Sequence, residues 1–354
     1  MRKMNGTELR VLEAMSRRVS DPVSIRQLTS EIQEESGPAY YPNVYRALSS
    51  LQKEGIVTME KHGKASIPAL NFANYLLLDT LTEMELQKKQ KFLRKWPDTW
   101  GLFESLEWEL GDMSSVGSIL LLDPERNAKL NRAEPLVLMD GKDKAREGRV
   151  EKAAREIGVR LSVRVNPLVV DGAELVEGLR SPQKNPFKEM LSEAVVLCMP
   201  QNFWKLIRDA VVHGVRIRFD PERTDPSKIG EKDPAYNLAR LGYREIGSLV
   251  ERGQGFSVEY TVSSALLSED KRRIAAVPVL LAKNKIDYPL LCFLSRRYGF
   301  AEKLLGALIA MINVVPTKEV DHAIAAISGA GVSPAKMDEA HVRQTLRLYG
   351  IGAR

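Results

Sequence analysis

A group of side chains that can hydrogen-bond to nucleic-acid bases lies between residues 40 and 46. The group comprises Tyr40, Tyr41, Asn43 and Arg46. In the major groove, Arg can donate two hydrogen bonds to guanine, and Asn can form two hydrogen bonds with N6 and N7 of adenine. Basic side chains nearby can contact phosphates. The candidate nucleic-acid contacts are Tyr40, Tyr41, Asn43, Arg46, Ser50, Lys53, Lys61, His62, Lys64 and Arg26.

A second possible chemistry involves three carboxylates near two apolar runs, residues 119–122 and 136–139. Asp123 follows the first run, Glu134 precedes the second, and Asp140 follows the second. Carboxylates can hold magnesium ions that activate an attacking oxygen and stabilise a leaving one. The spacing matches no known metal motif, and acids near strand ends are usually solvated. The sequence leaves this metal set open, and we predict neither a metal nor a cofactor.

The composition limits the class of protein. The chain has 354 residues, of which 44% are hydrophobic and 28% charged, and this fits a soluble protein of about two to four domains. The net charge of +6 permits nucleic acid as a partner without requiring it. Cys198 and Cys292 lie in apolar contexts, which indicates buried thiols in a reducing compartment. With no signal core and no apolar run long enough to cross a bilayer, we expect a cytoplasmic protein without a membrane partner.

The clearest predicted elements lie in the first 72 residues. Apolar side chains recur at helical spacing in three segments, and two strand-like segments then flank a short turn. Thr7 and Ser24 are the expected N-caps of the first two helices, and Gly55 is the expected stop of the third. The predicted helices span residues 7–15, 24–35 and 42–55, and the predicted strands span residues 56–61 and 65–70.

Three helices followed by a two-stranded hairpin resemble a winged helix-turn-helix domain. The phrase LSSLQKEGIV, residues 48–57, is typical of that family because a recognition helix ends in a glycine and a strand follows. The resemblance implies double-stranded DNA as the partner, with the third helix in the major groove. It also implies that the turn at 61–64 contacts the minor groove or phosphates, and that Arg17, Arg18 and Arg26 contact phosphates.

The middle of the chain alternates strand and helix patterns after a helical segment. Residues 73–110 are predicted to be amphipathic helices that include the basic run QKKQKFLRKW, and residues 111–220 are predicted to be a mixed α/β unit. The predicted strands of that unit are 118–122, 135–139, 159–170, 194–199 and 215–219, and its predicted helices are 146–158, 173–179, 187–192 and 200–214.

The order of these elements, with the phrases NPLVVDGAEL and EAVVLCMPQNFWKLIRDAVVHGV, carries a second resemblance. Residues 116–219 resemble in layout a minimal nucleotidyltransferase of the polymerase-beta-like superfamily. The resemblance implies a Gly-Ser turn for a nucleotide triphosphate and three carboxylates for two magnesium ions. The Gly-Ser position falls on Asp123-Pro124, where proline has no N–H to donate and the acid repels phosphate. The Arg-Gly position falls near Asn127-Ala128.

The carboxylates of this chemistry are also mostly replaced. The Asp-x-Asp position falls on residues 134–136, so that Glu134 is the only acid and Leu136 stands where a metal ligand is needed. The strand that should carry the third acid offers Arg160, Ser162 and Arg164. We therefore predict that catalysis is lost and that the chain has no catalytic residues.

The C-terminal third is predicted to be helical. Residues 221–235, PERTDPSKIGEKDPA, are the best linker of the chain because they are rich in Pro, Asp and Lys. Ser333 and Pro334 are the expected N-cap and first-turn proline of the last helix. The predicted helices span residues 236–251, 264–282, 288–299, 302–315, 318–327 and 334–350.

The predicted fold class is therefore multidomain α+β, with a winged helix, a mixed α/β nucleotidyltransferase-like sheet and an all-α C-terminal domain. We expect a DNA-binding transcriptional regulator whose other domains bind a ligand, a partner or a second copy. Two alternatives stay open: an active nucleotidyltransferase targeted by its winged helix, and a scaffold whose winged helix binds protein. A homodimer is expected because one winged helix covers a short site, with residues 76–86 and 304–315 as candidate interface helices. The predicted domains are 1–72, 73–110, 111–220 and 236–354.

Overall fold

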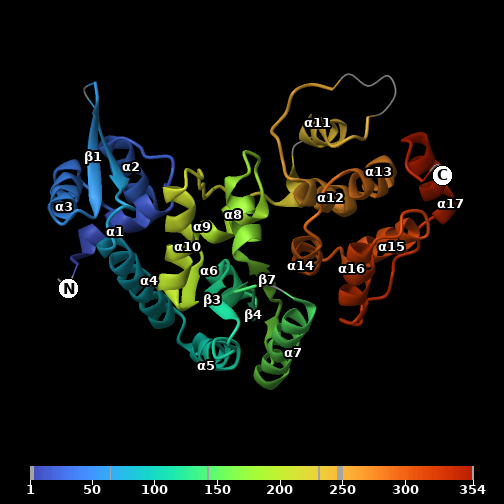
Figure 1. The fold of residues 1–354 in the computed structure, drawn as a ribbon, viewed down its shortest axis with the longest axis horizontal. Helices are drawn as coiled ribbons and strands as arrows, with labels where there is room; N and C mark the ends of the chain where they lie inside the picture. The colour runs from blue at the N-terminus through green and yellow to red at the C-terminus, as the bar shows by residue number, and fades with distance from the viewer. Residues whose placement is uncertain (1–3, 64, 142, 230–231, 245–249, 353–354) are drawn as a thin grey trace. The chain divides into compact units, whose positions relative to one another are not determined.

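The structure is a computed structural model that describes residues 4–63, 65–141, 143–229, 232–244 and 250–352. The chain divides into two compact units, Met1–Ser181 with Phe187–Glu222, and Pro182–Pro186 with Arg223–Arg354 (Figure 1). The first unit combines helices with small sheets. In the described part of the second unit, the regular structure is helical apart from one β-bridge. The expectation of an α+β chain with more than one unit is confirmed at this coarse level.

The first unit begins with three helices and a hairpin, in the predicted order. They are α1 (Gly6–Ser16), α2 (Ile25–Ser36), α3 (Tyr41–Lys53), β1 (Val57–His62) and β2 (Ala65–Leu70). The prediction that Thr7 caps the first helix was wrong. Asn5 is the N-cap, because its side chain accepts from the N–H of Glu8 while the Glu8 carboxylate accepts from the N–H of Asn5. Ser24 caps α2 as predicted, and Gly55 ends the turn after α3 with φ +73°.

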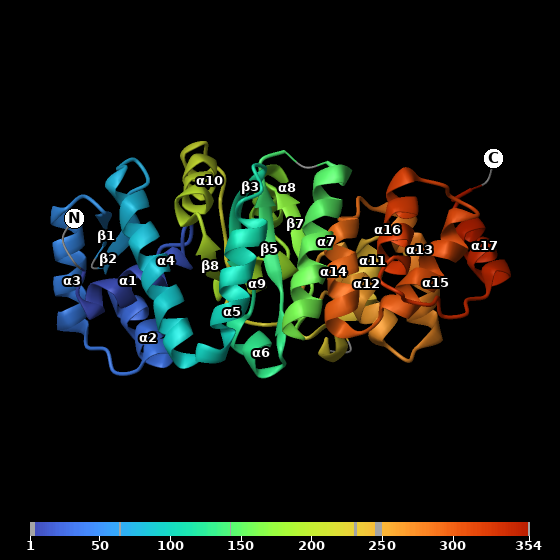
Figure 2. The same ribbon diagram turned by 90° about the horizontal axis from the view of Figure 1, so that it is seen from below.

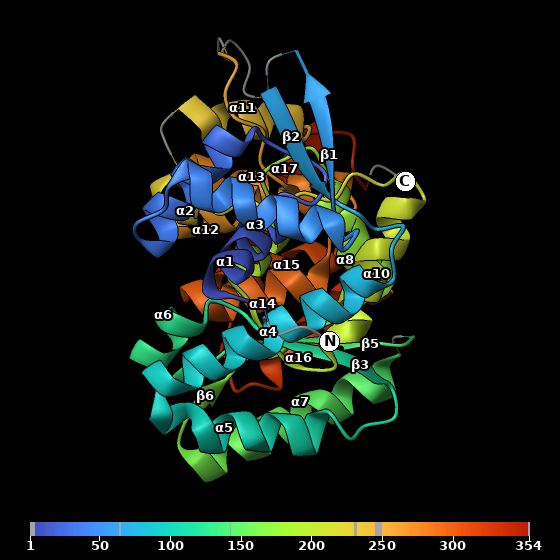
Figure 3. The same ribbon diagram turned by 90° about the vertical axis from the view of Figure 1, so that its left-hand side faces the viewer.

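Apolar side chains from the three helices form a small core beneath α3. Leu12 of α1, Leu28 of α2 and Leu48 of α3 are all almost fully buried. The Arg10 guanidinium donates to the carbonyl of Gly37 at 2.6 Å, which fixes the chain just before α3 begins. In Figure 3, α3 lies nearest the viewer with the hairpin beside it. The position of α3 is therefore set by both burial and hydrogen bonding.

A four-stranded mixed sheet lies further along the first unit (Figure 2). Its strands are β3 (Val116–Leu121), β5 (Pro135–Met139), β7 (Leu168–Asp171) and β8 (Val195–Cys198). They are ordered β7-β5-β3-β8, with β3 antiparallel to both of its neighbours and β5 parallel to β7. The strands are apolar on both faces, so both faces need cover. Phe92, Phe103 and Ile157 pack with one face, while Phe203 and Trp204 lie beside buried strand residues of the other.

Helices and short segments surround this sheet. Their placement agrees with most of the predicted helices between residues 73 and 214. The elements are α4 (Leu76–Lys95), η1 (Pro97–Thr99), α5 (Trp100–Ser105), η2 (Leu106–Leu110), α6 (Pro124–Lys129), α7 (Lys144–Leu161), α8 (Gly172–Arg180), α9 (Pro186–Ser192) and α10 (Pro200–Val212), with the strand pair β4 (Arg132–Ala133) and β6 (Arg164–Val165).

Two predicted strands of this unit were wrong. The predicted strand 159–170 is divided, because α7 continues to Leu161 and Ser162 ends it in the left-handed conformation with φ +54°. Residues 215–219 form no strand. The N–H of Ile217 donates to the Ser20 hydroxyl at 2.9 Å, and the N–H of Arg218 donates to a helix end rather than to a ladder.

The described part of the second unit contains one short 3₁₀ segment and seven helices. They are η3 (Pro226–Lys228), α11 (Lys232–Arg240), α12 (Val258–Leu267), α13 (Lys271–Lys283), α14 (Tyr288–Tyr298), α15 (Ala301–Ile312), α16 (Lys318–Ser328) and α17 (Glu339–Leu348). Of the predicted helix 236–251, residues 236–240 lie in α11 and residues 245–249 lie outside the described residues. The predicted helix 264–282 is two helices because Asp270 begins a new one as an N-cap. Ser333 is no N-cap, since α17 starts at Glu339 with Asp338 as its cap.

The most apolar helix of the second unit, α15, is a core element. Leu304, Leu305, Leu308 and Met311 are each at most 1% exposed. Burial within the chain therefore accounts for this segment, which was one of the two candidate interface helices. Across the described ranges, none of the helices combines the length and apolarity that crossing a bilayer requires.

Candidate nucleic-acid interface

Helix α3 buries one face and exposes the other. Val44, Ala47, Leu48 and Leu51 are at most 5% exposed and form a stripe with helical spacing. That stripe packs against α1, α2 and β1. The side chains that occupy the opposite face are Pro42, Tyr45, Arg46, Ser49 and Lys53. A helix anchored along its whole length in this way presents those side chains rigidly.

The predicted contacts of α3 lie at different angles around the helix. At about 100° per residue, Arg46 and Lys53 lie within about 30° of the centre of the exposed face. Asn43 lies about 90° from that centre, although it is exposed. Ser50 lies between Arg46 and Asn43, and Ser49 and Ser50 are both partly buried. The helix therefore brings Arg46 and Lys53 together on one face and leaves Asn43 at the edge.

Three tyrosines stand exposed at the start of α3. Tyr40 is 67% exposed, and Tyr41 and Tyr45 are each 44% exposed. The rings of Tyr41 and Tyr45 stack with centroids 6.2 Å apart and an interplanar angle of 19°. The prediction from sequence did not include Tyr45. Its spacing of four from Tyr41 was the available signal, because residues four apart share a helix face.

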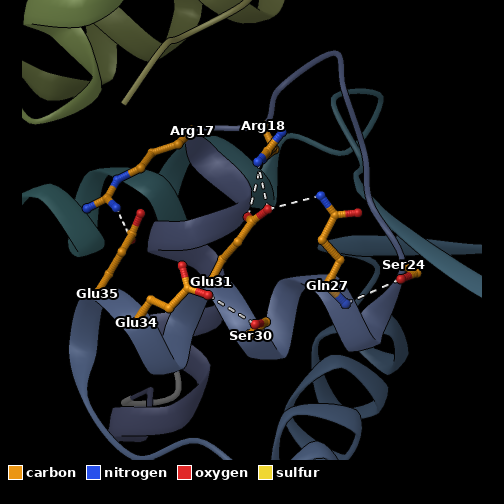
Figure 4. Close-up of polar contacts among 8 residues, drawn as sticks. All are labelled: Arg17, Arg18, Ser24, Gln27, Ser30, Glu31, Glu34 and Glu35. Carbon is orange, nitrogen blue, oxygen red and sulfur yellow. Dashed lines mark hydrogen bonds and ion pairs between the residues drawn. The ribbon is translucent and has the colours of Figure 1, made fainter. Parts of the chain in front are cut away.

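Two arginines that were expected to contact phosphates have carboxylate partners instead. Arg17 pairs with Glu35, and Arg18 donates to the Glu31 carboxylate at 2.6 Å (Figure 4). Both glutamates lie on α2, so the two ion pairs tie the segment after α1 to α2. In this structure Arg17 and Arg18 hold α2 against the end of α1 and neutralise two of its glutamates, and their contact with phosphates stays a prediction.

The remaining predicted contacts lie on α2 and on the hairpin. Arg26 is exposed in the first turn of α2. Lys61 is exposed near the end of β1, and Gly63 turns the chain with φ +61°. The backbone of His62 pairs with that of Ala65, but its side chain is outside the described part of the structure, and so is the whole of Lys64.

The helices and hairpin are held against the rest of the first unit by specific contacts. Besides the Ser20–Ile217 hydrogen bond, the Arg208 guanidinium of α10 donates to the carbonyl of Phe72 at 3.1 Å and lies 4.2 Å from the centre of the Tyr75 ring. These contacts follow directly after β2 and α1. These contacts thus connect the three helices and the hairpin to α10 and to the segment that follows it.

A buried charged pair lies on α4, the helix that follows the hairpin. Glu85 of α4 is 2% exposed, and its carboxylate lies 3.2 Å from the Lys88 ammonium group. Burial raises the pKa of Glu85, while the neighbouring Lys88 lowers it. Lys88 also donates to the carbonyl of Ala194 at 3.1 Å, just before β8. The pair therefore links α4 to the sheet and is not directed to the surface of α3.

The three carboxylates near the strands do not converge. Because Leu121 pairs with Pro135, Asp123 and Glu134 lie at one end of the β3–β5 pair. Asp140 lies beyond the other end of β5, about 20 Å away at 3.3 Å per strand residue. Within the ranges that the structure covers, no cluster of three or more His, Cys, Asp or Glu could hold a metal ion. The metal set that the sequence left open is therefore contradicted.

The turn at Asp123-Pro124, which the resemblance assigned to a triphosphate, has a geometry that does not suit one. Asp123 is 2% exposed and left-handed with φ +41°, and Pro124 begins α6. Asn127 uses its amide to donate to the Leu122 carbonyl at 2.6 Å and to accept from Arg132 at 3.0 Å. The polar groups at this end of the sheet therefore hold the turn itself. Arg160 and Ser162 belong to the end of α7 and not to a strand.

Comparison of the chain with known proteins found no similar protein. No protein-family model, curated protein or solved structure matches the chain. Since a fold alone does not assign a function, the function has to be inferred from the positions and chemistry of the side chains of the chain.

Proposed function

We propose that this protein binds double-stranded DNA through a winged helix-turn-helix formed by α1, α2, α3 and the β1–β2 hairpin, and that it acts as a transcriptional regulator. The observation that carries the proposal is the exposed face of α3, which holds Arg46 and Lys53 opposite a fully buried stripe. A rigid helix with polar and basic side chains on its outer face can enter the major groove.

The distribution of charge supports the same partner. No Asp or Glu occurs between residues 36 and 53, so the whole of α3 and the turn before it lack negative charge. The glutamates on α2 that would repel phosphates are partly neutralised, since Arg18 bonds Glu31 and Arg17 bonds Glu35. The net charge of α3 and its approach is thus positive, which suits a phosphate backbone.

Salt dependence provides a quantitative test. Exposed cations on the described part of this surface include Arg26, Arg46, Lys53 and Lys61. If each neutralises one phosphate, the logarithm of the binding constant falls with the logarithm of salt concentration at a slope of about −3.6, from about −0.9 per contact. Two copies on one site would give about twice that slope. We propose a homodimer on DNA because one winged helix covers only a short site, and a slope near −3.6 with a monomer in sedimentation at micromolar concentration would contradict it.

The decisive experiment uses the full chain, a duplex selected from a random pool and an unselected duplex. Arg46→Ala should cost about 1–3 kcal/mol on the selected duplex if Arg46 contacts a base, and Lys53→Ala should weaken both duplexes equally and reduce the salt slope by about 1. Arg149→Ala is the matched control, because Arg149 is an exposed arginine on α7. Equal affinity in the wild type, Arg46→Ala and Arg149→Ala would refute the proposal and favour protein as the partner of the exposed tyrosines.

For the sheet, we propose a nucleotidyltransferase-like domain that has lost nucleotidyl transfer. The support is the separation of Asp140 from Asp123 and Glu134, and the proline at the turn. Labelled nucleotide would be incubated with the chain, magnesium or manganese, and candidate acceptors. Incorporation that disappears in Glu134→Ala would establish the alternative, an active enzyme targeted by its DNA-binding helices.

A further inference from the structure

Two hydrogen-bonding side chains lie near the centre of the exposed face of α3, and they have opposite capabilities. Arg46 and Ser49 are three residues apart, which brings their Cβ atoms to about 5–6 Å. A guanidinium group has only donors. A hydroxyl group has one donor and two acceptor positions, and which of these is available depends on its own hydrogen bond.

The donor of the Ser49 hydroxyl is already used. Its Oγ lies 2.9 Å from the carbonyl oxygen of Tyr45, one turn earlier in α3. A carbonyl oxygen can only accept, so the hydroxyl hydrogen points back to the helix and the two lone pairs point outward. The outer surface of α3 therefore presents a set of donors at Arg46 and, one turn along, an oxygen that accepts while its hydrogen stays on the Tyr45 carbonyl.

The bases differ in whether they present donors or acceptors to these two side chains in the major groove. Guanine presents N7 and O6, which are acceptors, and thymine presents O4, another acceptor. Adenine and cytosine each present an amino group, which is a donor. Arg46 therefore suits guanine. The lone pairs of Ser49 suit adenine or cytosine and are repelled by the keto oxygen of guanine or thymine.

We propose that α3 selects a two-base feature on one DNA strand: a guanine contacted by Arg46, and beside it an amino base, adenine or cytosine, contacted by Ser49. Neighbouring bases are about 3.4 Å apart along a strand, and the long Arg46 side chain can reach the base next to that of Ser49 across the roughly 5–6 Å between their Cβ atoms. This inference rests on the proposed DNA binding and names the class of sequence that is bound. It adds Ser49 to the residues that determine specificity.

The test is selection of duplexes from a randomised pool by the full chain, followed by affinity measurements on a panel with each base at the position beside the guanine. The wild type should enrich guanine next to adenine or cytosine, and should prefer these over guanine or thymine there by about fivefold or more. Ser49→Ala should keep the guanine and reduce the neighbour preference to less than about twofold. Arg46→Ala should lose the guanine.

Gln52→Ala is the control on the same helix, because Gln52 is exposed on α3 but lies about 90° from the centre of the exposed face. Gln52→Ala should keep both preferences. Circular dichroism of each variant checks that the helices form. A neighbour preference for guanine or thymine, or one that survives Ser49→Ala, would overturn the inference. Salt-dependent binding without any base preference would overturn it while leaving DNA binding intact, whereas no binding to any duplex would refute both.

Discussion

A glycine inside helix α15 gives a prediction in which two physical effects have opposite signs. Gly306 lies in the buried middle of α15, where alanine would normally be the better helix former. Replacing Gly with Ala in a helix interior stabilises by about 1 kcal/mol from conformational propensity alone. An added Cβ at Gly306, however, would lie 2.2 Å from the carbonyl oxygen of Ala335, which crosses the helix there.

The steric cost should exceed the gain in propensity. A methyl group needs more than 3 Å from a carbonyl oxygen, and the crossing segment cannot move freely because the N–H of Ala335 donates to the carbonyl of Glu302 at 2.9 Å. Overpacking of this kind costs about 1–3 kcal/mol, and sometimes more. Disturbing the hydrogen bond adds about 1 kcal/mol. We therefore expect Gly306→Ala to lower the free energy of unfolding by about 1–3 kcal/mol.

Gly148 is the matched control for this substitution. It lies on the exposed side of α7, and an added Cβ would meet nothing within 4 Å. Gly148→Ala should therefore stabilise its unit by up to about 1 kcal/mol. The same chemical change is thus expected to have opposite effects at two helix positions.

The two units can be followed separately during urea unfolding. All four tryptophans belong to the first unit, so tryptophan fluorescence reports that unit, while far-ultraviolet circular dichroism reports the helices of both. Gly306→Ala should shift only the circular dichroism midpoint to lower urea, and Gly148→Ala should shift the fluorescence midpoint to higher urea. If Gly306→Ala stabilises as Gly148→Ala does, the packing argument is wrong.

Three further substitutions test other contacts. Leu48→Ala empties a fully buried site and should destabilise the first unit by about 2–5 kcal/mol in urea unfolding; a cost below about 1 kcal/mol would contradict the core described beneath α3. Ser20→Ala removes the acceptor of the buried Ile217 N–H and should cost about 1–3 kcal/mol, which an unchanged fluorescence midpoint would exclude. Burial raises the pKa of Glu259, whose carboxylate accepts from the N–H of Asp287. The folded state therefore holds the proton of the Glu259 carboxyl group more tightly than the unfolded state does. The resulting stability is complete below the pKa of the unfolded state and is lost as pH rises through the pKa of the folded state. Glu259→Gln keeps an acceptor but cannot ionise. The free energy of unfolding of this variant, relative to that of the wild type, should therefore increase from pH 4 to pH 7 by up to about 1.4 kcal/mol per unit of pKa shift. An equal difference between variant and wild type at both pH values would refute this.

The sequence predicts elements well where one periodicity dominates and poorly where two compete. Helix α2 has its apolar residues on one face and its cap at Ser24, and both were predicted. Residues 159–165 alternate apolar and polar side chains, which favours a strand. Val150, Ile157 and Leu161, however, follow helical spacing. The helix forms here because Val150 and Ile157 are completely buried against the sheet. Val159 is left 79% exposed as a consequence.

The carboxylates near the strands illustrate a second limit. Asp123, Glu134 and Asp140 lie close in sequence, and each adjoins a strand end, which was sufficient reason to consider a metal site. Which end of the sheet each acid occupies depends on strand direction. Glu134 and Asp140 flank the same strand, β5, and lie at its opposite ends whatever its direction, whereas the antiparallel pairing of β3 with β5 decides that Glu134 is the acid near Asp123. Direction of pairing is a tertiary property that the apolar runs do not encode.

The basic residues of the N-terminal helices show what the structure adds to a count of charges. Residues 1–72 contain ten Lys and Arg against eight Asp and Glu, a balance that singles out no surface. In the structure Arg17 and Arg18 face glutamates on α2, whereas Arg46 and Lys53 lie on a helix face that has no acid of its own. The difference arises because α2 carries its glutamates in its second half, beside the end of α1, while α3 carries none. Arg46 and Lys53 of α3, with Arg26 and Lys61 on the neighbouring elements, are therefore the exposed cations that can meet a phosphate, even though the paired arginines look the same in the sequence.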